Sequence, residues 1–108
     1  MVKLDVQKAM LELGITEDFY KELLGDFLAQ ADASHKNLLE LKDAGPFDEI
    51  AREGHALKGS AANLRIDEIS ELGKAIEVVA KGTQDRGELK KLVEVLEEAI
   101  HTLRAMIG

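Results

Sequence analysis

One of the three histidines, His55, stands in a pattern that suits phosphoryl chemistry, with a lysine and two small residues after it. In a helix that turns about 100° per residue, Lys58, Gly59 and Ala62 lie on the same face as His55. A neutral imidazole nitrogen is a nucleophile near pH 7 without a base to activate it. The pattern therefore predicts phosphoryl acceptance, with Lys58 as a positive charge for the phosphoryl oxygens and room for the donor over Gly59 and Ala62.

The same segment carries an apolar stripe that is separate from His55. His55 lies roughly 120° of arc from the centre of this stripe, so we expect its ring to be exposed to solvent. Two small members of the stripe, Gly54 and Ala61, predict that a neighbouring helix approaches closely. The stripe consists of Phe47, Ile50, Ala51, Gly54, Leu57, Ala61 and Leu64.

The residues around His55 resemble the histidine-containing phosphotransfer (HPt) domains of two-component phosphorelays. The resemblance extends from about residue 5 to about residue 77, and beyond it the chain matches only as an amphipathic helix. The motif that carries it is His55, Leu57, Lys58, Gly59, Ser60, Asn63 and Leu64, followed by Ile69, Leu72, Ile76 and Glu77 and preceded by Phe19, Tyr20, Leu23, Leu24 and Phe27.

The resemblance implies a role for each motif residue. His55 would be the phosphoacceptor, Lys58 the cation beside the phosphoryl group, and Gly59 the small residue that lets a receiver domain dock. Ser60 and Asn63 would be supporting polar positions. On the helix surface around His55, the candidates for the receiver interface are Ala51, Arg52, Gly59 and Ala62.

The resemblance also implies a carrier rather than an enzyme. The chain would take a phosphoryl group from the aspartate of one receiver domain and pass it to another. These receivers would be domains of response regulators or hybrid sensor kinases. We expect a monomer without a cofactor of its own, and Mg²⁺ supplied by the receiver. The sequence contains no glycine-rich phosphate loop, and Ser60 has no histidine and carboxylate at the spacing of a hydrolase. Neither pattern therefore argues for an enzyme.

Arg65 departs from the family pattern. Many members have glycine directly after the Asn-Leu pair, where the histidine helix ends. Glycine fits a left-handed, helix-terminating conformation at little cost, whereas arginine would be strained there or would need a different exit. The sequence alone therefore does not determine how this helix ends.

The composition predicts one helical domain over residues 1–108. Leucine, alanine, glutamate and lysine dominate, and only 4% of the residues are aromatic. The net charge of −7 disfavours nucleic acid and anionic membranes as partners. The absence of cysteine and of an apolar leader favours the cytoplasm. Met1 and the lack of a linker favour a free-standing protein over a domain of a larger kinase.

Apolar periodicity and capping residues predict five helices. Four long amphipathic helices favour an all-α, up-down-up-down four-helix bundle, with a short N-terminal helix across one end. The second helix would bury Phe19, Leu23, Phe27, Ala31, Leu38 and Leu41. The starts are predicted at Asp5, Thr16, Pro46, Asp67 and Asp85, and the ends near Gly14, Leu41, Leu64 and Lys81.

Two other functions are compatible with the sequence. The first is an adaptor that binds receivers without carrying phosphate. The second is a metal-binding bundle, because Asp32 and His35, and likewise Glu98 and His101, have the spacing that paired-metal bundles use. Glu98 and His101 lie away from the apolar stripe of their helix, so we expect His35 and His101 to be solvated surface residues.

Overall fold

The computed structural model describes residues 3–107, which form an all-α fold as the sequence predicts. No strand occurs within these residues, and none of their helices is both long and apolar enough to cross a lipid bilayer. The helices are α1 (Val6–Leu13), α2 (Glu17–Leu41), α3 (Phe47–Asn63), α4 (Asp67–Lys81) and α5 (Arg86–Ile107).

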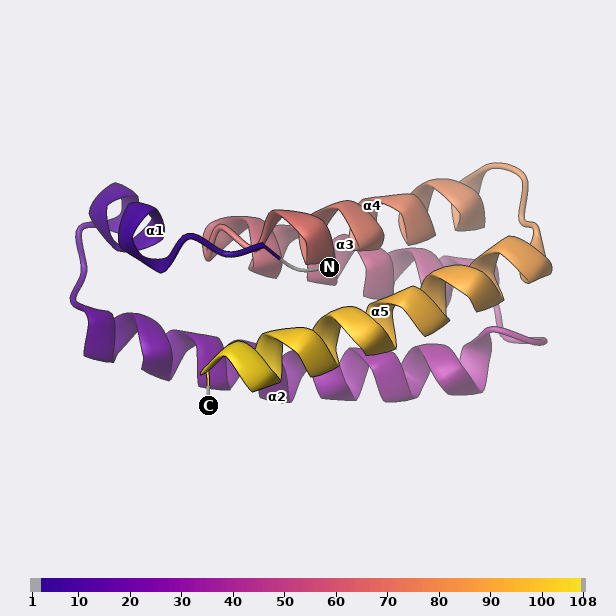
Figure 1. Ribbon diagram of the computed structural model, residues 1–108. Helices are drawn as coiled ribbons and strands as arrows, with labels where there is room; N and C mark the ends of the chain where they lie inside the picture. The colour runs from indigo at the N-terminus through magenta and orange to yellow at the C-terminus, as the bar shows by residue number, and fades with distance from the viewer. Residues whose placement is uncertain (1–2, 108) are drawn as a thin grey trace.

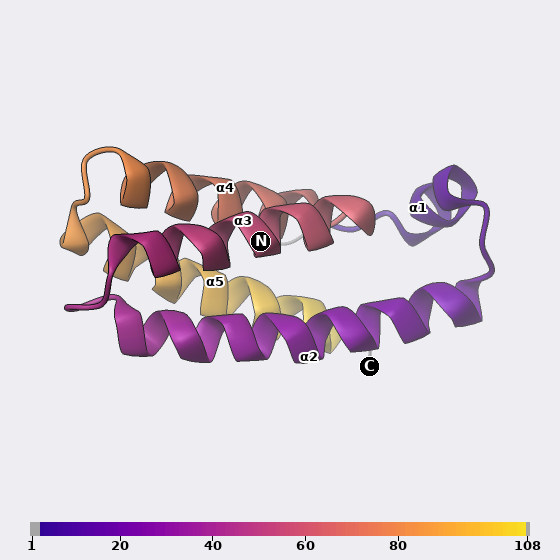
Figure 2. The ribbon, with the colours of Figure 1, turned by 180° about the vertical axis from the view of Figure 1, so that it is seen from behind.

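The four long helices form an elongated bundle in which chain neighbours run antiparallel (Figure 1). α2 contacts α3 and α5, and α4 contacts the same two helices, so the four enclose one core. The short α1 lies at the end of the bundle where α2 begins, as the view from behind also shows (Figure 2). The predicted up-down-up-down topology with an additional N-terminal helix is therefore confirmed.

Three of the predicted helix starts are made by side chains that accept hydrogen bonds from the first turn. Asp5 accepts from the backbone N–H of Lys8 at 3.0 Å, and Thr16 accepts from that of Phe19 at 3.2 Å. The carboxylate of Asp85 accepts from the backbone N–H of Glu88 at 3.2 Å. Each bond satisfies a donor that the helix itself leaves unpaired, which fixes where α1, α2 and α5 begin.

Two other starts differ from the prediction. Pro46 stands at the N-cap position, one residue before α3, rather than within its first turn. Asp67 does not cap α4: it is the first residue of the helix, and buried Ile66 occupies the cap position without a side-chain cap bond. Asp67 still favours this end, because a negative charge in the first turn complements the helix dipole.

The end of α3 resolves the question that Arg65 raised. The helix ends at Asn63, and Arg65 itself adopts the left-handed conformation, with φ of 65°. The backbone N–H groups of Arg65 and Ile66 return to the carbonyls of Ala62 and Ala61 at 3.1 and 2.9 Å, which is the bonding of a Schellman motif. The arginine thus occupies the position that glycine favours, at a cost of about 1 kcal/mol.

Side-chain contacts hold Arg65 in this conformation. Its guanidinium donates to the carbonyls of Ala62 and Asn63 at 3.3 and 3.4 Å, and to the carboxylate of Glu12 at 3.3 Å. The hydroxyl of Tyr20 donates to the carbonyl of Leu64 at 2.5 Å. Carbonyls at the helix end thereby gain donors that offset the backbone strain.

The inner face of α2 contains Phe27, Ala31 and Leu38 as predicted, but it differs from the prediction at the start of the helix. Phe19 is 48% exposed, whereas the neighbouring Tyr20 is fully buried. The hydrogen bond from Tyr20 to the end of α3 holds the Tyr20 face inward, and Phe19 lies one residue, about 100°, away from it. The buried residues of α2 are Tyr20, Leu24, Phe27, Leu28, Ala31, Ser34 and Leu38.

Candidate functional site

The ring of His55 is open to solvent on the outer side of α3. Its side chain is 65% exposed, which confirms the exposure predicted from the apolar stripe. The residues before and after it along the core face, Gly54 and Leu57, are buried. The helix is therefore anchored through one face while the imidazole stays accessible.

A close approach of α3 and α4 brings a second helix to the flank of His55. A Cβ atom on Gly54 would lie 2.6 Å from the carbonyl oxygen of Gly73, and a Cβ on Gly73 would lie 2.6 Å from the carbonyl oxygen of Gly54. Only glycine at both positions permits this backbone contact. Glu77, one turn after Gly73, is thereby placed beside His55.

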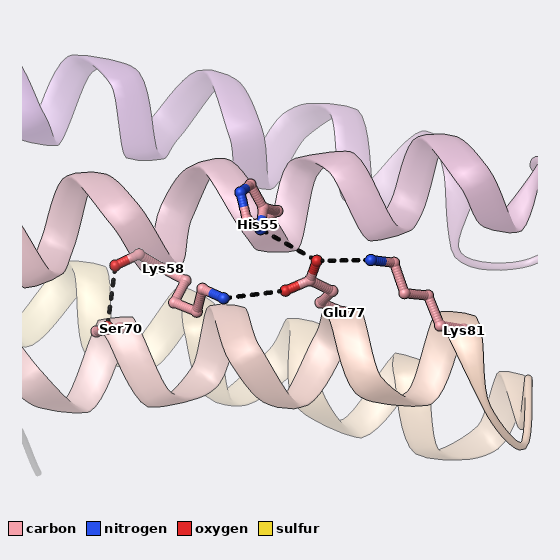
Figure 3. A network of polar contacts seen from close by, with 5 residues as sticks. All are labelled: His55, Lys58, Ser70, Glu77 and Lys81. Carbon is pink, nitrogen blue, oxygen red and sulfur yellow. Dashed lines mark hydrogen bonds and ion pairs between the residues drawn. The ribbon is translucent and has the colours of Figure 1, made fainter.

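Glu77 is the centre of a polar network on this flank (Figure 3). Its Oε2 atom lies 3.1 Å from Nδ1 of His55 and 3.0 Å from Nζ of Lys81. Its Oε1 atom accepts from Nζ of Lys58 at 3.4 Å. One carboxylate thus joins the imidazole to two lysines, one from each of the two helices.

The surroundings of Glu77 keep it ionised. The hydrogen bond from Lys81 is the largest cause that lowers the pKa of Glu77, and the bond and charge of Lys58 act in the same direction. Partial burial, which leaves the side chain 12% exposed, opposes them without reversing the shift. Near neutral pH, Glu77 therefore presents a carboxylate to the ring.

The carboxylate determines which ring nitrogen of His55 can react. A carboxylate only accepts hydrogen bonds, so Nδ1 must carry the proton that is donated to Glu77. In the neutral ring the lone pair then belongs to Nε2. Figure 3 shows the second ring nitrogen pointing away from Glu77, so the geometry presents Nε2 as the nucleophilic atom.

Lys58 follows His55 by one turn, as the sequence pattern requires, and its ammonium group is engaged with Glu77. Its backbone carbonyl accepts a hydrogen bond from Oγ of Ser70 at 2.9 Å, which ties α3 to α4 next to the network. The lysine side chain remains 37% exposed. The ammonium group is therefore not confined to a buried site.

The four candidate docking residues are not equivalent. Gly59 faces open space, with no atom within 4 Å of an added Cβ, and Ala62 is exposed one turn further along. Arg52 is exposed and lines a shallow hollow together with His55 and Lys81. Ala51 lines the same hollow, but it is 5% exposed and packs in the core, so it offers a partner much less surface than the other three residues.

The two supporting polar residues lie in different surroundings. Oγ of Ser60 accepts a hydrogen bond from Nε2 of Gln30 at 2.8 Å, which joins α3 to α2. Asn63 is exposed in the last turn of α3, where its backbone carbonyl accepts from Arg65. The structure thus brings Ser60 into helix packing and leaves Asn63 at the helix end.

Sequence reasoning assigned no role to Glu77, and it did not single out Lys81 or Ser70. A signal was present, because Gly54 and Gly73 are both small members of apolar stripes. Pairing these two glycines would have set the register of α3 against α4 and placed Glu77 near His55. The apolar pattern of one helix shows which face a residue lies on. It does not show which residue of the neighbouring helix lies opposite.

The other two histidines line a hollow between α2 and α5. His101 is exposed, as expected. His35 is not a solvated surface residue: its side chain is 14% exposed, and its Nε2 atom is buried 3.9 Å from a carboxylate oxygen of Glu97. Within residues 3–107, no group of three histidine, aspartate or glutamate residues is arranged to hold a metal ion.

Comparison with known proteins places this chain in a family. A family model of the Hpt domain matches residues 22–106. The chain is also 32% identical over 99 residues to the chemotaxis protein CheA of Borreliella burgdorferi, a match that covers 82% of this chain and 11% of that protein. No solved structure matches the chain. The chain therefore belongs to the Hpt domain family, which serves histidine phosphotransfer in two-component signalling.

Proposed function

We propose that His55 accepts a phosphoryl group from the phosphoaspartate of one receiver domain and passes it to the aspartate of another. The observation that carries this proposal is the exposed imidazole whose Nδ1 is held by an ionised carboxylate. Such a ring needs no further base, because its Nε2 lone pair is available near neutral pH.

The reaction is an in-line displacement at phosphorus. The Nε2 lone pair forms the N–P bond while the bond from phosphorus to the aspartyl oxygen breaks, which returns the donor aspartate as a carboxylate. The Nδ1 proton stays in place, so the phosphorylated ring carries a positive charge. Glu77 faces that charge at 3.1 Å from Nδ1 and stabilises it, and the reverse sequence delivers the group to the second receiver.

Lys58 would supply the cation for the transferred group. From its position beside Glu77, its flexible side chain can turn toward the phosphoryl oxygens. Gly59 and Ala62 leave the surface beside His55 open for the receiver, and Arg52 lies at the edge of this surface. The receiver would bring the Mg²⁺ that neutralises the phosphoryl oxygens, and we place this exchange in the cytoplasm.

The proposal is tested by incubation with a receiver domain that carries a ³²P-labelled phosphoaspartate. We expect the wild-type chain to take up an acid-labile label, and His55→Gln to take up none. His101→Gln is the matched control, since it removes an exposed histidine away from the site, and it should be labelled as the wild type is.

The second half of the relay is tested by adding an unlabelled second receiver to the phosphorylated chain. Loss of label from His55 with its appearance on that receiver is the expected result. Equal labelling of wild type and His55→Gln would refute the assignment of the acceptor. Receiver binding that persists in His55→Gln, with no acid-labile adduct in the wild type, would instead support the adaptor that binds without carrying phosphate.

A further inference from the structure

We infer that Lys81 is a positioning residue of the site. Acting through Glu77, it offsets the carboxylate charge beside the ring of His55 before transfer and keeps Glu77 paired after transfer. The inference rests on the proposed function, because it assigns to Lys81 a part in that same reaction. The sequence pattern around His55 does not contain this residue, which reaches the site from another helix.

The hydrogen bonds distinguish Lys81 from Lys58. Lys81 bonds Oε2 of Glu77, the same oxygen that faces Nδ1 of His55, whereas Lys58 bonds the opposite oxygen. Lys81 and Glu77 are four residues apart on α4, so this pair is held within one helix. Lys58 belongs to α3, the helix that carries the reacting ring. The two lysines therefore approach the same carboxylate from different helices.

Charge explains why one lysine is not enough before transfer. A poorly solvated carboxylate beside an imidazole favours the protonated ring, and the protonated ring is not a nucleophile. Glu77 is 12% exposed and touches the ring, so its charge would have this effect if left without cations. Two ammonium groups on its two oxygens oppose it.

Charge also explains why one lysine is not enough after transfer. If Lys58 turns to the phosphoryl oxygens, Oε1 of Glu77 loses its partner while a group with further negative charge sits nearby. Lys81 then remains on Oε2 and keeps the carboxylate paired. Without Lys81, the movement of Lys58 would leave a partly buried carboxylate without a lysine partner, which is unfavourable.

Other charged groups lie near the ring, but the lysine bonds to Glu77 come from Lys58 and Lys81. α3, the helix that carries His55, contributes Lys58. Asp48 and Arg52, also on α3, line the hollow that contains His55 and Lys81. From α4 the ring faces Glu77 and Lys81. The polar contacts that α2 makes with α3 run from Asn37 to Glu53 and from Gln30 to Ser60, on other parts of the helix.

The test compares the pH dependence of labelling from the phosphorylated receiver. In Lys81→Gln, we expect the acid limb of the rate profile to move to higher pH and the rate near pH 7 to fall about three- to tenfold, as for a rise of roughly one unit in the ring pKa. Lys81→Arg should restore most of the rate, because it retains the charge. Lys91→Gln on exposed α5 surface makes the same change in net charge and should behave as the wild type.

Two further measurements separate this inference from the proposed function. The Lys81→Gln effect should disappear in a Glu77→Gln background, because the lysine acts through that carboxylate. In ¹⁵N NMR of the unphosphorylated chain, ring protonation of His55 should occur at higher pH in Lys81→Gln than in the wild type. This readout needs no receiver, so it tests Lys81 even if labelling fails.

The outcomes are distinguishable. Failure of the wild type to be labelled at His55 would refute the relay alone. A labelled wild type with Lys81→Gln indistinguishable from Lys91→Gln, in both the rate profile and the NMR titration, would refute the role of Lys81 alone. An unchanged Lys81→Gln effect in the Glu77→Gln background would show that the lysine does not act through Glu77.

Discussion

At the scale of the residue, Glu77 links stability to pH as well as supporting the ring. The lysine contacts hold its folded-state pKa below the ordinary value of 4.5, so the carboxylate contributes stability above that value and loses it as pH falls through the lowered pKa. We expect Glu77→Gln to be less stable than the wild type at neutral pH. The difference should shrink as the pH falls through the lowered pKa, because below it Glu77 is protonated in both the folded and the unfolded chain.

Urea unfolding of both proteins at about pH 7, 5 and 3 measures this effect. The exposed pair of Lys90 and Asp43 provides a comparison, because lysine hydrogen bonds also lower the pKa of Asp43. Lys90→Gln should change stability little at any pH, since the pair is solvated. A Glu77→Gln deficit that grows toward acid would contradict the assigned sign.

The residue scale also marks how far the sequence alone could reach at the site. The exposure of His55 and the helical spacing of Lys58 and Gly59 follow from the geometry of one helix, and both were predicted. The contact of His55 with Glu77 depends on how α3 and α4 are aligned, which one helix pattern does not determine. Ala51 is close to His55 along the helix, but it is only 5% exposed because it packs in the core. Closeness to His55 in the sequence therefore did not predict exposure.

At the scale of the element, the backbone contact of Gly54 with Gly73 sets the distance between α3 and α4. A Cβ on Gly54 would lie 2.6 Å from one backbone atom and 2.9 Å from another, the amide nitrogen of Glu77, neither of which can turn aside. We expect Gly54→Ala to destabilise the fold by about 1 to 3 kcal/mol. It should also slow phosphoryl acceptance, because α4 must withdraw Glu77 from His55.

Gly59→Ala is the matched control on the same helix. Its added methyl group meets open space, so the higher helix propensity of alanine should stabilise the fold by about 0.5 to 1 kcal/mol. Thermal unfolding of both variants checks the contrast. Equal effects of the two substitutions would show that the close approach of α3 and α4 is not what Gly54 provides.

Helix existence and direction followed from periodicity, but the way in which α3 ends and the residue that caps α4 did not. Tertiary contacts decided both: Arg65 adopts a left-handed conformation supported by bonds to Glu12 and to the last turn of α3, and Ile66 is buried where Asp67 was expected to cap. Local capping rules weigh only neighbouring residues. They therefore fail where a distant partner or the core determines the turn.

At the scale of the whole molecule, Arg86 connects three helices at the end of the bundle away from α1. As the first residue of α5, it donates to the carbonyls of Leu41 and Lys42 at 3.1 and 3.3 Å and to that of Gly45 at 2.7 Å. Its guanidinium also lies 3.9 Å from the ring centre of Phe47, at the start of α3. The end of α2, the connecting loop and the start of the histidine helix are thus held by one side chain.

We expect Arg86→Ala to lower the free energy of unfolding by about 2 to 4 kcal/mol, because three carbonyls lose a charged donor and Phe47 loses its cation. Arg104→Ala is the matched control: its arginine joins α5 to α2 through Asp32, but both partners are about half exposed, so the loss should be below about 1 kcal/mol. Urea unfolding measures both. Hydrogen exchange should quicken around residues 41–47 in Arg86→Ala only, and similar losses in the two variants would contradict a special role for Arg86 in joining the bundle.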